Sequence, residues 1–112
     1  MLIGAGLKVF ESLDSMKAAG EREFDLISMI HVLEHIPDPV GYLEQLRDNY
    51  LTPQGRILIE VPNLFAHDSF EIAHLTSFSR HSLVEVVKIA GFTTIFLEPH
   101  GRPRSNMIPL YI

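Results

Sequence analysis

Short apolar runs alternate with longer amphipathic stretches along the chain, and glycine and proline residues separate them. The run Phe24–Ile30 (FDLISMI) is largely apolar, which is typical of a strand that a parallel sheet buries on both faces. Arg56–Val61 (RILIEV) predicts a second apolar strand. Phe92–Leu97 (FTTIFL) predicts a third, because β-branched and aromatic residues favour strands. Leu7–Phe10 and Met107–Ile112 are shorter strand candidates towards the two ends.

Two amphipathic stretches predict helices with well-marked N-termini. Asp38 is a favourable N-cap for a helix over Pro39–Tyr50, and proline suits the first helical position. Ser79 is the expected N-cap of a second helix over Arg80–Ala90. In both helices the core-facing positions recur at three- and four-residue spacing. They are Val40, Leu43, Leu46, Arg47 and Tyr50 in the first helix, and Leu83, Val86, Val87 and Ala90 in the second.

The remaining segments predict one short helix and several connections. Leu13–Gly20 is expected to be a short helix that its glycine ends, and Thr52–Gly55 a turn. Leu64–Ser77 is expected to be irregular with one helical turn, and His100–Asn106 to be a loop. Strands and helices therefore alternate, which predicts an α/β fold with a parallel or mixed sheet. The last two strands should pair antiparallel, because the loop joining them is too short for a crossover helix.

Length and charge narrow the class of protein. The chain has 112 residues, of which 46% are hydrophobic and 21% charged, so one soluble domain is expected over residues 1–112. The net charge is −5, and a nucleic-acid partner is not expected, because phosphate contacts need clustered cations. Cysteine is absent, which fits a cytoplasmic location. No signal peptide and no uncharged run of the ~20 residues that a membrane span needs are visible.

The segment that leaves the first apolar strand, Met29–His35, is the candidate ligand site. Open α/β sheets bind ligands beyond the carboxyl ends of their strands. His31, Glu34 and His35 also match the H-x-x-E-H pattern of one class of zinc hydrolases, which keeps a metal hydrolase as a third hypothesis. Two prolines follow within four residues and prevent a long ligand-bearing helix, so no metal site is expected. Local packing of both histidines is the remaining alternative.

Three blocks of sequence, in this order, resemble class I S-adenosylmethionine-dependent methyltransferases. They are Phe24–Pro39 (FDLISMIHVLEHIPDP), Leu51–Asn63 (LTPQGRILIEVPN) and His74–Phe92, which ends in Ala-Gly-Phe. The resemblance covers about Gly6 to Leu97. It is strongest to the branch that methylates small molecules and includes enzymes of the ubiquinone-biosynthesis type.

The resemblance implies a partial Rossmann-like sheet. The family has seven strands in the order 3-2-1-4-5-7-6. The five strand candidates of this chain are similar to strands three to seven, the last two of them antiparallel. The chain therefore resembles the C-terminal portion of the domain. A compressed alternative takes Ile3–Gly6 as the glycine-rich turn, but only seventeen residues then separate Gly6 from Phe24.

The resemblance also implies methyl transfer from S-adenosylmethionine to a small-molecule acceptor. Met29, Ile30 and His31 would lie beside the methionine part of this cofactor. Asp14 and Ser15 would lie beside its adenine. His31 or His35 would act as the general base for an acceptor hydroxyl group, because imidazole titrates near neutral pH.

Loss of the first two strands would leave an exposed sheet edge and an apolar patch on the sheet. Exposed edges and apolar patches favour association with another chain. A homo-oligomer is therefore expected. A non-catalytic remnant that serves as an oligomerisation or interaction module is the alternative to an enzyme.

Overall fold

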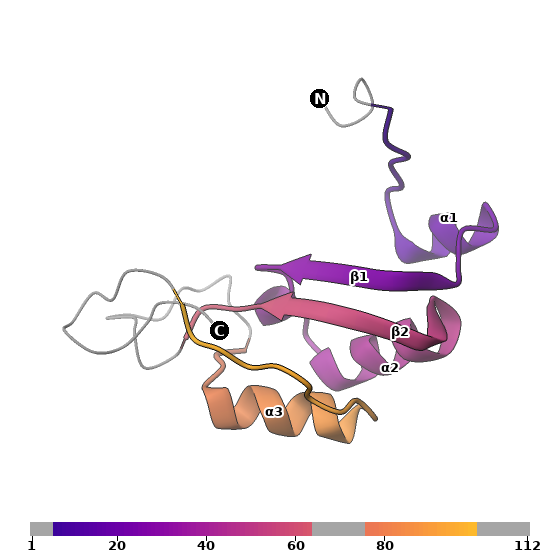
Figure 1. Ribbon diagram of the computed structural model, residues 1–112. Helices are drawn as coiled ribbons and strands as arrows, with labels where there is room; N and C mark the ends of the chain where they lie inside the picture. Colours follow the sequence, from indigo (N-terminus) through magenta and orange to yellow (C-terminus); the bar gives the residue numbers. More distant parts are fainter. Residues whose placement is uncertain (1–5, 64–75, 101–112) are drawn as a thin grey trace.

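The computed structural model describes residues 6–63 and 76–100 (Figure 1). The predicted strand Met107–Ile112, and with it the antiparallel pairing of the last two strands, lies outside these residues. So do nearly all of the predicted irregular segment and loop. The elements in chain order are α1 (Leu13–Ala18), β1 (Phe24–Ile30), a 3₁₀ turn (Leu33–His35), α2 (Pro39–Asn49), β2 (Leu51–Glu60) and α3 (Arg80–Ile89).

β1 and β2 form a parallel pair, as the alternation of strands and helices predicts. Their aligned residues run from Leu26 opposite Arg56 to Ile30 opposite Glu60. α2 makes the connection between the two strands and returns the chain to the starting end of the sheet (Figure 1). The carboxyl ends of both strands consequently lie side by side.

β2 begins earlier than the sequence predicts. It starts at Leu51 and includes Thr52–Gly55, which was expected to be a turn. The pairing is irregular there, because β2 advances five residues where β1 advances two, between the pairs Phe24–Leu51 and Leu26–Arg56. A side chain at Gly55 would put Cβ 2.5 Å from Cγ of Leu51, so glycine permits this close approach. Thr52–Gly55 therefore forms an irregular part of β2, with a shift in register, and not a separate turn.

The predicted helices are confirmed together with their N-caps. The backbone N–H of Gly41 donates to Oδ1 of Asp38 at 3.0 Å, which caps α2. The N–H of Ser82 donates to Oγ of Ser79 at 3.1 Å, which caps α3. These local hydrogen bonds satisfy donors that the first helical turn leaves unpaired. No helix within residues 6–63 and 76–100 has the length and apolar character needed to cross a membrane.

The hydrophobic core lies between the sheet and the pair α2 and α3. Residues from five segments meet in it, and their side chains are almost fully buried. They are Met29, Leu33, Leu43, Leu46, Tyr50, Val61, Phe78, Leu83 and Ala90. Ile27, Ile57 and Ile59 pack against this core from the same face of the sheet. α2 and α3 are also joined by Arg47, whose Nη1 donates to the carbonyl of Ala90 at the end of α3. Most of the α2 and α3 positions that were predicted to face the core therefore do so.

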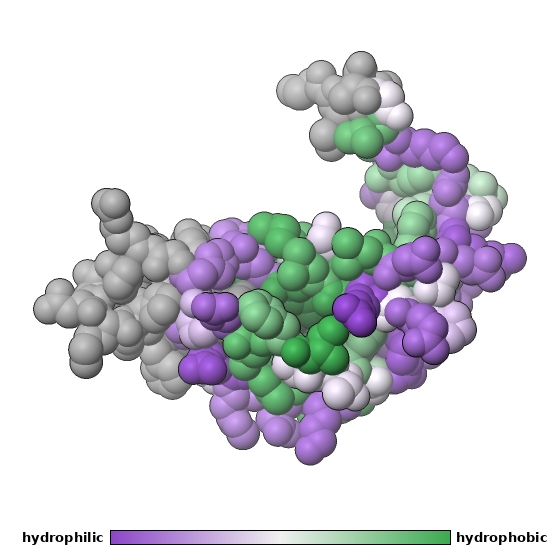
Figure 2. All heavy atoms as spheres, in the orientation of Figure 1, coloured by the Kyte–Doolittle hydropathy of each residue, from purple (hydrophilic) through white to green (hydrophobic). Residues whose placement is uncertain are grey.

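The opposite face of the sheet is open, which corrects the expectation that β1 is buried on both faces. Leu26 is 62% exposed and Leu58 is 54% exposed, and Ile30 lies exposed on the same face. Figure 2, in the orientation of Figure 1, shows apolar surface over the strands. We call Leu26, Ile30 and Leu58 the open apolar face. It is uncovered because α2 and α3 both pack on the other side.

Two predicted strands are not strands in the structure. Leu7–Phe10 and Phe92–Leu97 have no regular secondary structure. A strand needs a neighbour to complete its backbone hydrogen bonds, and neither segment pairs with another strand among the residues that the structure describes. Phe92 and Leu97 pack against the core, whereas Ile95 and Phe96 are exposed. The apolar composition of Phe92–Leu97 therefore correctly indicated that its two ends pack against the core. It did not indicate whether the segment pairs with another strand.

Candidate functional site

The carboxyl ends of β1 and β2 form the candidate site. Ile30 and Glu60 are the last aligned residues of the two strands. One step further, the backbone N–H of His31 donates to the carbonyl of Glu60 at 2.9 Å. The chain leaving β1 is therefore held against the end of β2, at the edge where parallel sheets bind ligands.

His31 has a left-handed backbone conformation, with φ of 55°. A non-glycine residue in this region stores about 1–3 kcal/mol of strain, and such residues cluster at functional sites. In a regular strand His31 would share the face of Met29, which is the core face. Instead, Nε2 of His31 lies 2.8 Å from Oε1 of Glu60, a residue of the open face. The strained backbone thus brings the imidazole to the carboxylate of the neighbouring strand.

A second histidine contacts the same carboxylate. Nε2 of His100 lies 3.1 Å from Oε2 of Glu60, so each oxygen has its own imidazole. All three side chains retain access to solvent, and Glu60 is the least exposed of them. The sequence predicted His31 as a site residue, but it gave Glu60 no role and left His100 in a loop. The sequence feature that could have pointed to Glu60 is a charged residue near the end of an otherwise apolar strand. The structure adds that Glu60 pairs with Ile30.

Glu34 is the most unusual residue at this edge. It lies in the 3₁₀ turn, and the residue is 2% exposed. Among the residues that the structure describes, neither of its carboxylate oxygens has a hydrogen-bond partner. Its backbone carbonyl accepts from the N–H of Thr76 at 3.1 Å, which fixes the turn. Burying a carboxylate without donors is costly, and a buried unsatisfied group in a folded protein requires an explanation such as a functional role. The sequence had placed Glu34 only within the zinc-hydrolase pattern.

The histidines and the glutamate of that pattern do not converge on a metal position. The segment is one 3₁₀ turn, with Glu34 buried and His31 and His35 exposed. Among the described residues, no group of three histidine, aspartate, glutamate or cysteine side chains is arranged to hold a metal ion. This geometry gives the hydrolase hypothesis no support.

The predicted cofactor residues of β1 lie on different surfaces. Met29 is buried in the core, and Ile30 is on the open apolar face, as strand alternation requires. His31 is at the edge of the sheet. The structure therefore brings His31 and Ile30 to an accessible surface, while Met29 reaches the edge only through its backbone.

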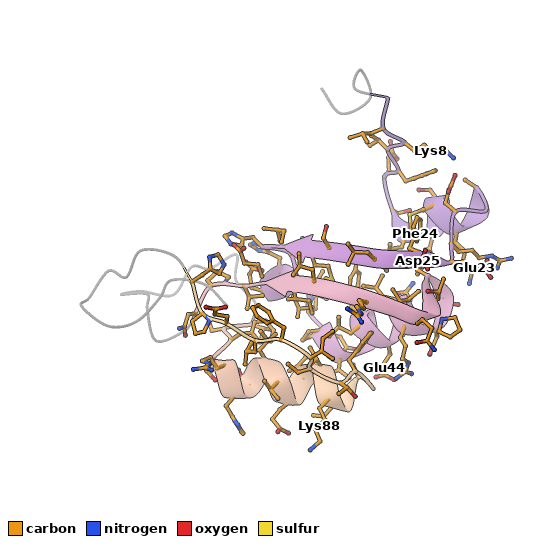
Figure 3. The ribbon with its side chains drawn as sticks, viewed as in Figure 1. Lys8, Glu23, Phe24, Asp25, Glu44 and Lys88 are labelled. Atoms are coloured by element: carbon orange, nitrogen blue, oxygen red, sulfur yellow. The ribbon has the colours of Figure 1, made fainter. Side chains whose placement is uncertain are left out.

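Asp14 and Ser15 lie at the other end of the sheet. They belong to α1, whose first residue, Leu13, accepts a hydrogen bond of 2.8 Å at its carbonyl from Tyr50 Oη. Tyr50 directly precedes β2, so α1 sits near the amino ends of the strands. Figure 3 shows Glu23, Phe24 and Asp25 at this end, away from the arrowhead of β1. The structure does not bring Asp14 and Ser15 together with His31. Ser15 instead completes the N-terminal capping box of α1.

The assembled edge can accept a proton and orient the group that accepts it. An ionised carboxylate only accepts hydrogen bonds, so Oε1 of Glu60 accepts from the Nε2–H of His31 and orients that ring. A histidine oriented by a carboxylate is a recurrent arrangement in general acid–base catalysis.

Comparison with known proteins gives one finding on the family. A family profile described as a methyltransferase domain matches residues 7–96, which includes every helix and strand described above. No curated protein matches the chain.

Proposed function

Because the chain belongs to the methyltransferase domain family, we propose that it is the C-terminal portion of an S-adenosylmethionine-dependent enzyme that methylates a small molecule. The observation that carries this proposal is the cluster of His31, Glu60 and His100 at the carboxyl edge of a parallel sheet. The sequence blocks around this edge favour the small-molecule branch of the family, of the ubiquinone-biosynthesis type. The absence of cysteine fits a cytoplasmic enzyme.

The residues at the edge fit a positively charged cofactor. S-adenosylmethionine carries a sulfonium and an ammonium group, and the buried carboxylate of Glu34 has no hydrogen-bond donor within residues 6–63 and 76–100. When bound, this cofactor supplies an electrophilic methyl group. Met29, Ile30 and His31 are the residues proposed to hold its methionine part. Asp14 and Ser15, which were expected beside its adenine, lie near the amino ends of the strands and are not included in this proposal. His31 or His35 would remove the proton of an acceptor hydroxyl group.

Binding of the cofactor tests this proposal without knowledge of the acceptor. Isothermal titration calorimetry of the chain should give a dissociation constant of about micromolar order for S-adenosylmethionine, which corresponds to about −8 kcal/mol. The demethylated product, S-adenosylhomocysteine, lacks the sulfonium charge and serves as the matched ligand. The absence of heat from either ligand at millimolar concentration would contradict cofactor binding and favour a non-catalytic remnant.

The open apolar face favours the second candidate, a homo-oligomerisation or interaction module. Leu26, Ile30 and Leu58 are exposed together, and within the described ranges the outer edge of β1 has no strand beside it. A second copy could cover this surface and pair with this edge. Static light scattering at rising protein concentration should then give at least the mass of a dimer. A monomer mass of 12.7 kDa at all concentrations would exclude self-association through this face.

A further inference from the structure

We propose that the uncovered face of the sheet is a dimer interface, on which a second copy of the chain packs about a two-fold axis that runs along the row of Ser28 and Leu58. The inference rests on the second candidate function, the homo-oligomerisation module, and gives it a geometry. It follows from the order of apolar and charged residues on the two strands, which makes this face complementary to itself.

Six side chains make up the uncovered face, in three rows of paired strand neighbours. The rows are Leu26 with Arg56, Ser28 with Leu58, and Ile30 with Glu60. Strand alternation places them opposite the residues that pack in or against the core, which are Ile27, Met29, Ile57 and Ile59. Glu60 is half-buried, whereas the other five residues are exposed. We call this set the six-residue face, and Figure 2 shows apolar surface over its strands.

A two-fold axis across the strands, along the middle row, stacks each strand on its own copy in the opposite direction. Leu26 then lies opposite Ile30 of the second copy, and Leu58 lies opposite Leu58 at the axis. Arg56 lies opposite Glu60 of the second copy, and symmetry makes this contact occur twice. Apolar residues therefore meet apolar residues, and opposite charges meet. An interface of this kind, formed by the same patch on both subunits, is the commonest in homodimers.

A two-fold axis along the strands is the other simple way to stack the two faces, and it matches poorly. β1 would then lie over β2 of the second copy, so Leu26 would face Arg56 and Ile30 would face Glu60. Each charged group would be covered by an apolar side chain without a partner of opposite charge, which is costly. The order of residues thus favours the axis across the strands.

The two charged residues are placed to make this contact. Arg56 is exposed and forms no salt bridge with the residues that the structure describes. Glu60 contacts His31 and His100, but an ionised carboxylate has about four acceptor positions, so an arginine can be added. Sheets that pack face to face lie about 10 Å apart, a distance that an arginine and a glutamate span together. Apolar burial would supply most of the attraction, and the charges would fix the orientation.

The size of the interface sets the strength that we expect. Two short strands offer less surface than the roughly 800 Å² that each partner buries in a standard complex. We therefore expect a weak dimer, with a dissociation constant of about micromolar to millimolar order. Sedimentation equilibrium at rising protein concentration should show the mass increase from the monomer mass of 12.7 kDa towards twice that value.

Two single charge reversals and their mixture test the geometry. Arg56→Glu makes both charged positions acidic, and Glu60→Arg makes both basic. Each variant alone should weaken self-association at least about tenfold, because like charges then face each other twice in every dimer. An equimolar mixture of the two variants should restore a dimer, because each contact between the two different chains then joins opposite charges.

Control variants separate the contact from the change in net charge. Arg22→Glu makes the same change at an exposed arginine outside the six-residue face and should keep the wild-type affinity. Leu58→Asp places two carboxylates at the axis and should also weaken the dimer, which tests the packing even if Glu60→Arg does not fold. Ile95→Asp, at a position that is 70% exposed and outside this face, should not weaken it. Circular dichroism should show the same helix content in all folded variants.

The outcomes separate this inference from the module itself. A dimer that persists in Arg56→Glu and Leu58→Asp would overturn this packing and keep self-association through another surface, such as the outer edge of β1. A mixture of two folded, monomeric variants that fails to dimerise would overturn the pairing of Arg56 with Glu60. A monomer mass for the wild-type protein up to millimolar concentration would overturn both the packing and the module, and would leave this face to a different polypeptide.

Discussion

Replacement of Phe78 with alanine is expected to lower the free energy of unfolding by about 3–5 kcal/mol, the usual cost of truncating a buried phenylalanine. Phe78 is 1% exposed and belongs to the core between the sheet and the helices. It also forms an isolated bridge with Asn63, just beyond the end of β2, and directly precedes Ser79, the N-cap of α3. A cavity at this position would therefore loosen both the core and the start of α3.

Urea denaturation followed by circular dichroism measures this change. Phe96→Ala is the matched control, because it truncates the same residue type at a position that is 76% exposed. The control should stay within about 0.5 kcal/mol of the wild-type protein. Equal losses in the two variants would contradict the packing described here.

Replacement of His31 with glutamine is expected to lower the rate of methyl transfer by about 10²–10⁴-fold, the range that a general base contributes. Glutamine keeps hydrogen-bonding capacity but cannot take up a proton near neutral pH. The sequence proposed His31 and His35 equally as the base. The structure favours His31, because its ring is held against Glu60 at the end of the neighbouring strand.

The comparison of His31→Gln with His35→Gln decides between the two bases, with phenolic acceptors and tritiated S-adenosylmethionine. The larger loss should occur at His31. His81→Gln changes an exposed histidine of α3 and controls for effects of the substitution itself. A larger loss at His35, or full activity of His31→Gln, would assign proton removal to another group.

The helices and strands that are marked by residues close together in the chain were predicted well from the sequence. Asp38 and Ser79 start α2 and α3 as predicted, because an N-cap depends on a side chain and the backbone only a few residues later. The apolar run of β1 was located at its full length of seven residues. The resemblance in three sequence blocks agrees with the methyltransferase profile over residues 7–96.

Elements that depend on a neighbour were predicted less well. Phe92–Leu97 has the composition of a strand but no strand beside it among the described residues, and composition does not reveal whether a partner is present. β2 begins at Leu51 and not at the predicted Arg56, because Leu51 pairs with Phe24 and the strand therefore includes the expected turn. Burial of β1 on one face rather than two follows from where α2 and α3 pack.

The sequence by itself determined where the helices begin, which strands are apolar, and the family. Those features depend on residues close together in the chain. Only the tertiary structure placed Glu60 between His31 and His100, buried the carboxylate of Glu34, and separated Asp14 and Ser15 from this edge. The physical reason is that strand register and the left-handed turn at His31 bring together side chains that are distant in sequence, and no local pattern encodes such contacts.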